Sequence, residues 1–258
     1  MPTLQHRMSL SGRTALVTGG SRGLGLEIAE GLAEAGARVW ITARREQWLG
    51  PALQQLRDAG HEAEAHPCDV GDPASVEALL AHLRARDVHV DVLVNNAGVT
   101  WAAPPEAMPL ERWYQVMQVN VTGPFLLARA LAPAMRARGY GRIVNVASVA
   151  GLMGTPSALM DAVGYSTSKA ALIGLTRDLA VKWAGGGVTV NAVAPGFFRT
   201  RMSEGLLEAN HDRIVAATPL GRIGAEGELK GVVALLASPA GAYVTGQVIA
   251  VDGGMTVS

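Results

Sequence analysis

The sequence contains a single cysteine, Cys68. One thiol cannot form a disulfide within the chain, and it cannot supply the ligands of a cysteine-based metal site. The histidines, at positions 6, 61, 66, 82, 89 and 211, do not recur at the spacing of a metal-binding motif. We therefore expect no bound metal, and the cysteine content fits a reducing compartment.

Long apolar runs and runs of one charge are also missing. No stretch approaches the roughly 18 apolar residues that a membrane-spanning helix needs, and the segment MPTLQHRMSLSGR lacks the apolar centre of a signal peptide. The 22 basic and 22 acidic residues balance, and no basic tract indicates a nucleic-acid or membrane surface. We expect a cytoplasmic protein whose partners are small molecules or copies of the same chain, with no nucleic acid and no membrane.

Apolar residues, by contrast, are abundant and ordered. They make up 49% of the 258 residues, against 17% charged residues, which permits a large core. Short β-branched apolar runs predict seven strands, at 14–19, 38–43, 62–68, 91–97, 142–148, 188–194 and 247–253. Amphipathic patterns between them predict helices at 24–36, 73–86, 106–117, 122–138, 165–184 and 226–237.

Strands that are apolar throughout and alternate with helices are typical of a parallel sheet covered on both faces. The pattern predicts an α/β, doubly wound Rossmann fold with a seven-stranded parallel sheet. No linker or repeat interrupts it, so residues 1–258 form one predicted dinucleotide-binding and catalytic domain. Within it we expect an N-terminal tail at 1–9 and a substrate lid at 197–217.

A glycine-rich stretch, TGGSRGLG (18–25), follows the first strand and opens the next helix. Its spacing is not G-x-G-x-x-G, but glycines still permit a tight turn, and the helix N-terminus still faces a phosphate. An ordinary glycine-rich turn is the alternative. We expect dinucleotide phosphates to bind at Gly19, Ser21, Arg22, Gly23, Leu24 and Gly25.

The second strand ends in Thr42-Ala43-Arg44-Arg45, without the carboxylate that would bind a ribose 2′-hydroxyl. The guanidinium groups of Arg44 and Arg45 suit a 2′-phosphate, and Arg22 supplies a third guanidinium group nearby. The pattern favours NADP over NAD, with NAD the alternative if Arg44 and Arg45 are merely solvated.

Two further strand ends face the same expected crevice. Asp69 and Val70 follow the third strand, where the carboxylate could accept a hydrogen bond from adenine. The fourth strand ends in NNAG, and Asn96, Ala97 and Gly98 would flank the crevice where the strand order reverses.

A tyrosine and a lysine four residues apart, Tyr165 and Lys169, share one face of a predicted helix. A neighbouring ammonium favours a phenolate, which makes Tyr165 a candidate general acid for ketone reduction and base for alcohol oxidation. Ser148, at the end of the fifth strand, could donate to the substrate oxygen. Asn120 is polar within an apolar helix pattern, and we expect it to hold a water that links Lys169 to solvent.

TGGSRGLG, NNAG, Asn120, Ser148, Tyr165-x-x-x-Lys169 and PGFFRT (195–200) together resemble the short-chain dehydrogenase/reductase family. The resemblance runs from Leu10 to the C-terminal VTGQVIAVDGG. It implies a nicotinamide cofactor and a homo-oligomer, commonly a tetramer with the C-terminal strand and long helices at its interfaces. It also implies that Ser148, Tyr165, Lys169 and Asn120 are catalytic, that Tyr165 and Lys169 also bind the cofactor, and that the nicotinamide side is lined by Pro195, Gly196, Phe198 and Thr200.

One departure from the family pattern concerns the serine. Ser148 precedes Tyr165 by 17 positions, more than is usual in close relatives. Ser157 is nearer, but it lies in a predicted loop rather than at a strand end. We keep Ser148 as the catalytic serine and interpret the extra residues as an enlarged loop over the substrate.

We expect the substrate to contact Trp101, Met153, Met160, Phe197 and Met202, and an anionic substrate could meet Arg199 or Arg201. The loop and lid resemble gluconate 5-dehydrogenase-like members, while SVAG and PGF resemble 3-oxoacyl carrier-protein reductases.

The predicted function is therefore an NADP(H)-dependent carbonyl reductase that interconverts a ketone and a secondary alcohol. The substrate would be a sugar acid, polyol or small ketone, with a 3-oxoacyl thioester as the alternative. Other classes are a non-catalytic NADP-binding sensor or scaffold and a sugar epimerase or dehydratase. The filled catalytic positions argue against a sensor.

Overall fold

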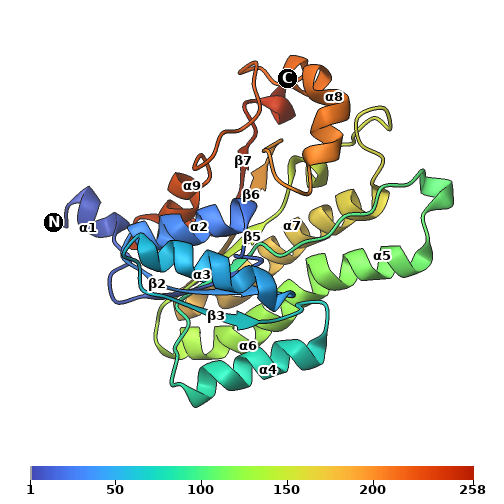
Figure 1. Ribbon diagram of the computed structural model, residues 1–258. Helices are drawn as coiled ribbons and strands as arrows, with labels where there is room; N and C mark the ends of the chain where they lie inside the picture. Colours follow the sequence, from blue (N-terminus) through green and yellow to red (C-terminus); the bar gives the residue numbers. More distant parts are fainter. Residues whose placement is uncertain (1) are drawn as a thin grey trace.

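Figure 1 shows one twisted sheet with helices on both faces, in a computed structural model that describes residues 2–258. Within that range, the sheet has seven parallel strands in the order β3-β2-β1-β4-β5-β6-β7. The strands are β1 Thr14–Thr18, β2 Arg38–Ala43, β3 Ala63–Pro67, β4 Val92–Asn95, β5 Gly141–Val146, β6 Val188–Pro195 and β7 Val248–Val251. The predicted doubly wound fold and its strands are confirmed.

The long helices cover the sheet in two layers, one on each face. Both faces can be covered because successive side chains of a strand point to opposite faces of the sheet. The helices are α2 Gly23–Glu34, α3 Leu49–Asp58, α4 Pro73–Ala85, α5 Leu110–Met117, α6 Gly123–Ala137, α7 Val163–Trp183 and α9 Lys230–Ala237. Ala15 and Val17 of β1 pack in a core with α2, α3 and α9, whereas Leu16 packs in a second core with α4, α6 and α7. In the part of the chain that the structure describes, no helix is both long and apolar enough to cross a membrane.

Some element boundaries differ from the predicted ones. The predicted tail contains a short helix, α1 Leu4–Met8, and the predicted lid contains α8 Glu204–Ala216, whose Leu207 and Ile214 are buried. The helix predicted at 106–117 is divided into a 3₁₀ turn, η2 Pro105–Ala107, and α5. Pro109 explains the division, because a proline disfavours helical backbone at the residue before it, and Met108 is extended.

The strand order reverses between β1 and β4, and side chains fix the strand ends there. Asn95 donates to Asn145 Oδ1 of the neighbouring β5 at 2.8 Å, and Asn96 Nδ2 donates to Thr18 O at 2.9 Å. Gly19 has φ of +65°, and a Cβ on it would lie 2.9 Å from the Cα of Ala97. Only glycine permits this approach. The turn after β1 and the turn after β4 therefore meet at the carboxyl edge of the sheet.

Candidate active site

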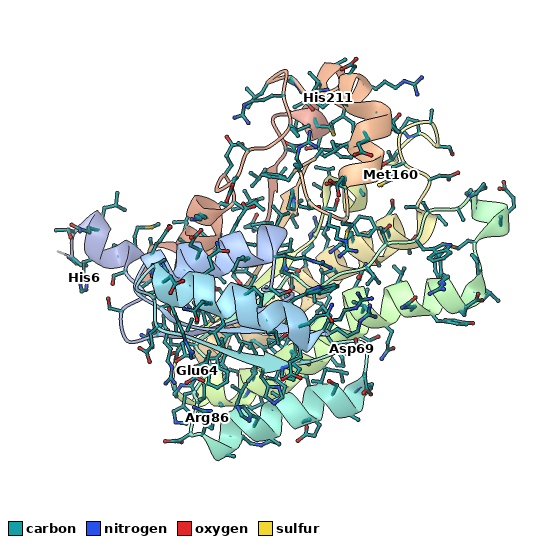
Figure 2. All side chains as sticks on the ribbon, viewed as in Figure 1. His6, Glu64, Asp69, Arg86, Met160 and His211 are labelled. Atoms are coloured by element: carbon teal, nitrogen blue, oxygen red, sulfur yellow. The ribbon has the colours of Figure 1, made fainter. Side chains whose placement is uncertain are left out.

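A cavity of about 1120 Å³ lies at this carboxyl edge, between the glycine turn, the ends of the central strands, α7 and α8. Figure 2 labels two residues that border it, Asp69 beyond the end of β3 and Met160 on the loop beside α8. The predicted cofactor-binding residues all line this cavity: Gly19, Ser21, Arg22, Gly23, Leu24, Gly25, Arg44, Arg45, Asp69, Val70, Asn96, Ala97, Gly98, Tyr165, Lys169, Pro195, Gly196, Phe198 and Thr200.

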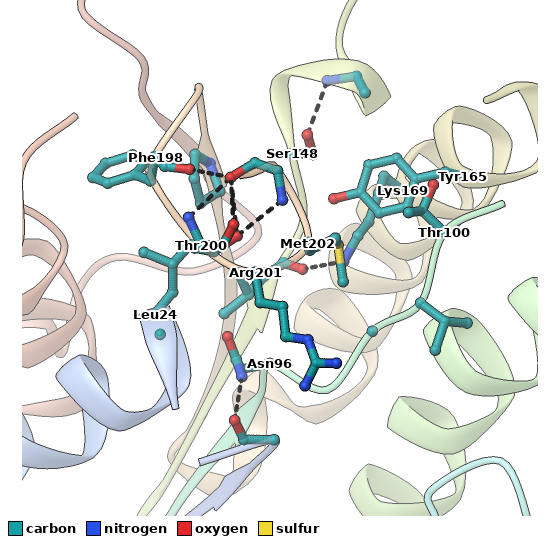
Figure 3. A pocket seen from close by; sticks show the side chains of 18 of the residues that line it. Leu24, Asn96, Thr100, Ser148, Tyr165, Lys169, Phe198, Thr200, Arg201 and Met202 are labelled. Carbon is teal, nitrogen blue, oxygen red and sulfur yellow. Dashed lines mark hydrogen bonds between the residues drawn. The ribbon is translucent and has the colours of Figure 1, made fainter. Parts of the chain in front are cut away.

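Helix α7 presents Tyr165 and Lys169 to the middle of the cavity (Figure 3). Lys169 is only 3% exposed, and its Nζ donates to Val146 O of β5 at 2.7 Å. The same Nζ lies 5.4 Å from the centre of the Tyr165 ring. Burial lowers the pKa of Lys169 from 10.5 to about 8, because one carbonyl replaces the water that an ammonium has in solution.

The lowered pKa of Lys169 predicts how stability depends on pH. Below about pH 8 the folded protein buries a charged ammonium, which lowers its free energy of unfolding. This loss of stability disappears as the pH rises from about 8 towards 10.5. Relative to Lys169→Met, the wild-type protein should therefore gain about 2–3 kcal/mol of unfolding free energy between about pH 7 and about pH 10. Urea unfolding of both proteins across this range measures the gain, and a pH-independent difference would contradict it.

Ser148 stands between the end of β5 and a 3₁₀ turn, η4 Val149–Gly151, which it caps by accepting from Ala150 N at 3.2 Å. Burial raises the pKa of the Tyr165 phenol, while the Ser148 hydroxyl acts in the opposite direction on that pKa. A Cβ on Gly151 would lie 2.7 Å from the Lys169 carbonyl carbon. This close packing of η4 on α7 holds Ser148 beside Tyr165 despite the long connection.

The connection between Ser148 and Tyr165 contributes Met153, Leu159 and Met160 to the cavity wall, but not its serine. Ser157 is exposed and does not line the cavity, whereas Ser148 does. The chain returns to α7 through a bridge between Ala103 and Ala162. The structure thus brings Ser148 together with Tyr165 and keeps Ser157 apart.

Asn120 lies in a π-helical turn, η3 Gln118–Thr122, that joins α5 to α6. Its Nδ2 donates to Val99 O and to Ser168 Oγ, both at 2.9 Å, and Ser168 Oγ donates to Tyr165 O at 2.7 Å. Both amide hydrogens are therefore used by protein groups, and the side chain does not line the cavity. Asn120 fixes the segment after β4 against the turn that carries Tyr165, so no amide hydrogen remains for the expected water.

The glycine turn is shaped for a phosphate. Helix α2 begins at Gly23 with no side chain capping its first N–H groups, which leaves these donors to a ligand. A Cβ on Gly25 would lie 2.3 Å from both Asn96 Nδ2 and Gly19 O. No side chain fits there, so backbone N–H groups can approach a dinucleotide closely.

Sequence reasoning missed Trp48, which lies in the turn after β2 and lines the cavity. The guanidinium of Arg22 lies 3.7 Å from the Trp48 ring centre and that of Arg45 lies 4.6 Å from it. The only signal was its position three residues after Arg45. The site thus joins a helix N-terminus to several cations, the donor set that a phosphorylated dinucleotide requires.

The other end of the cavity is mainly apolar. Of the residues expected to contact the substrate, Met153, Met160, Phe197 and Met202 line this end, whereas Trp101 does not line the cavity. The Arg112 guanidinium lies 4.2 Å from the Trp101 ring centre. Val149, Leu159, Leu206, Asn210 and Met255 also line this end. Leu206 and Asn210 belong to α8, which lies within the predicted lid.

Comparison with known proteins gives a consistent result. A family model described as enoyl-(acyl carrier protein) reductase matches residues 19–256. The 3-oxoacyl-[acyl-carrier-protein] reductase FabG of Vibrio cholerae is 42% identical over 96% of this chain and 99% of its own length. The rhamnolipids biosynthesis 3-oxoacyl-[acyl-carrier-protein] reductase of Pseudomonas aeruginosa is 42% identical, covering 95% of this chain and 97% of its own.

Solved structures agree over the whole fold. A gluconate 5-dehydrogenase from Burkholderia cenocepacia, in complex with NADP and tartrate, has a TM-score of 0.93 and 38% identity, covering 99% of this chain and 100% of its own. The Pseudomonas aeruginosa RhlG/NADP active-site complex has a TM-score of 0.90 and 40% identity, covering 97% of this chain and 99% of its own.

Proposed function

The chain belongs to the short-chain dehydrogenase/reductase family, and on that premise we propose that it reduces a ketone with an apolar chain, using NADPH and Tyr165 as the acid. It is an oxidoreductase that interconverts a ketone and a secondary alcohol. The observation that carries the proposal is the convergence of Tyr165, Lys169 and Ser148 on a cavity that has a phosphate turn at one end and apolar walls at the other.

Bound NADPH would supply the hydride, and the protein would supply the proton and the orientation. The Tyr165 hydroxyl donates its proton to the carbonyl oxygen as that oxygen gains charge, and Ser148 Oγ donates a hydrogen bond to the same oxygen. The Lys169 ammonium beside the ring stabilises the phenolate that remains. Asn120 does not contact the substrate; it positions Tyr165 through hydrogen bonds that run by way of Ser168 to the Tyr165 carbonyl.

NADP is the preferred cofactor in this proposal. The end of β2 carries no carboxylate for a ribose 2′-hydroxyl, and Arg22, Arg44 and Arg45 line the cavity beside the glycine turn. Relatives of known structure in complex with NADP support the same preference. NAD is the weaker alternative.

The substrate end favours a neutral, apolar substrate over a sugar acid. Of the cations that line the cavity, Arg22, Arg45 and Arg201 gather at Trp48, Arg44 follows β2 at the same cofactor end, and Lys169 lies beside the Tyr165 ring. The neighbouring Arg199 is exposed and does not line it. A substrate carboxylate would thus meet no cation beyond the catalytic group, whereas Met153, Leu159 and Phe197 suit the chain of a 3-oxoacyl thioester, the compound class named for the Vibrio cholerae relative.

Turnover of 3-oxoacyl thioesters of increasing chain length tests this proposal. Each added CH₂ that becomes buried should raise kcat/KM by about fourfold until the cavity is filled, and 5-ketogluconate should be a poor substrate. Met160→Ala should flatten this dependence, whereas Trp101→Ala, outside the cavity, should leave it unchanged. A higher kcat/KM for 5-ketogluconate than for every thioester would refute the assignment of substrate class.

We also propose that the enzyme is a homotetramer and works in the cytoplasm, to which its one buried cysteine is suited. Exposed apolar side chains lie on three helices: Leu110 and Tyr114 on α5, Phe125 on α6 and Val181 on α7. Strand β7 is an edge strand and could pair with another copy. Light scattering on the purified protein tests the tetramer, which a monomeric mass would contradict.

A further inference from the structure

Three arginines from distant parts of the chain gather around the Trp48 ring. Arg22 comes from the glycine turn, Arg45 follows β2, and Arg201 precedes α8 in the lid. Their guanidinium groups lie 3.7, 4.6 and 5.7 Å from the ring centre, respectively. The Arg201 side chain thus brings the lid next to the cofactor end of the cavity.

No carboxylate neutralises this cluster. Among residues 2–258, none of the three arginines forms a salt bridge, although the chain contains many such pairs elsewhere. Burial lowers the pKa of Arg22, and repulsion from Arg201 and Arg45 lowers that pKa further. Three like charges held together without a counterion favour binding of a multiply charged anion.

Hydrogen bonds hold the backbone on both sides of Arg201 in a defined turn next to the cavity. Ser203 Oγ accepts from Thr200 N at 2.9 Å and donates to Phe198 O at 2.5 Å, which closes a compact turn. Thr200 in turn lies against the glycine loop, since a Cβ on Gly23 would be 3.6 Å from its Cγ2. Figure 3 shows Arg201 extending from this turn into the cavity.

The same turn leads directly into α8. This helix begins at Glu204, three residues after Arg201, and its Leu206 and Asn210 line the substrate end. A ligand that orders Arg201 would therefore also order the first turn of the helix that walls the substrate end.

We propose that Arg201, with Trp48 as its support, binds the 2′-phosphate of NADP(H) together with Arg22 and Arg45, and that this contact holds the lid over the substrate. The 2′-phosphate would thus select the cofactor and order α8 at once. The inference depends on the proposed function only for the identity of the cofactor.

The test uses fragments that bind without reacting. Calorimetry would measure 2′,5′-ADP, which carries the additional phosphate, and 5′-AMP, which lacks it, on the wild-type protein, Arg201→Met and Arg199→Met. Loss of one charge-assisted contact should weaken 2′,5′-ADP by about tenfold in Arg201→Met and change 5′-AMP little. Arg199→Met is the matched control, since Arg199 does not line the cavity, and it should bind both fragments as the wild type does.

Hydrogen exchange provides the readout for the lid. In the wild type, 2′,5′-ADP should slow exchange of the α8 amides more than 5′-AMP does, and this difference should vanish in Arg201→Met. Trp48→Leu should reduce both the affinity for 2′,5′-ADP and the protection.

Two outcomes would overturn the inference: unchanged binding of 2′,5′-ADP by Arg201→Met, or equal protection of α8 by both fragments. An increase in KM for an anionic substrate, with unchanged binding of 2′,5′-ADP, would place Arg201 at the substrate instead. These binding results do not depend on turnover, so a protein that binds 2′,5′-ADP as expected but reduces no ketone would refute the proposed function alone.

Discussion

Tyr165→Phe is expected to lower kcat for ketone reduction by about 10²–10⁴-fold, the usual contribution of a general acid. The substitution removes one oxygen, and the ring still packs beside Lys169, whose hydrogen bond to Val146 O does not involve the phenol. The dissociation constant of NADPH should therefore change by less than about threefold. Steady-state turnover together with fluorescence titration of NADPH separates the two effects.

Tyr114→Phe is the control for this change. Tyr114 lies on α5 with 64% of its surface exposed and does not line the cavity, so the same substitution there should leave turnover unchanged. If Tyr165→Phe kept more than about a tenth of the wild-type kcat, Tyr165 could not be the proton donor.

Ser148→Ala is expected to lower kcat by about 10²–10³-fold, as is typical when a donor to a developing oxyanion is removed. The hydroxyl also acts on the Tyr165 phenol and lowers its pKa. Its loss should therefore shift the pH profile of alcohol oxidation, which needs the phenolate, to higher pH. Initial rates in both directions across a pH series measure both effects.

The paired variant is Ser157→Ala. Ser157 is exposed on the enlarged loop and does not line the cavity, so its removal should change neither kcat nor the pH profile. The reverse result, with Ser157→Ala inactive and Ser148→Ala active, would mean that the loop rearranges to bring Ser157 to the substrate.

The parts of the site that the sequence predicted well depend on local spacing. Tyr165 and Lys169 share a face because four positions separate them on one helix, wherever that helix lies. Gly19 and Gly25 are similar, since a strand, a glycine turn and a helix are consecutive in the chain. The strand pattern was equally informative, because a strand buried on both faces is apolar throughout.

The parts that were missed depend on contacts between distant segments. Trp48 and Arg201 are brought together with Arg22 only by the fold, and no spacing in the chain relates them. Trp101 lies three residues after NNAG, but its ring packs with Arg112 rather than in the cavity. The loop direction that decides this is set by tertiary packing.

Asn120 shows an intermediate case. Its polarity within an apolar pattern correctly marked it as unusual, and π-helical turns are frequent at functional sites. Its partners, Val99 and Ser168, belong to other elements. The sequence therefore indicated an important residue without indicating that its side-chain amide is used for positioning.

In the proposed reaction, a hydride passes from NADPH to a ketone in this cavity while Tyr165 supplies the proton. The most direct measurement follows deuterium from NADPH labelled at the nicotinamide C4 into the product formed from a 3-oxoacyl thioester. The wild-type protein should form a secondary alcohol with the label on its carbinol carbon, and Tyr165→Phe should form almost none. Tight binding of NADPH without transfer of label to any of a broad set of ketones would contradict this reaction and would identify a sensor or scaffold instead.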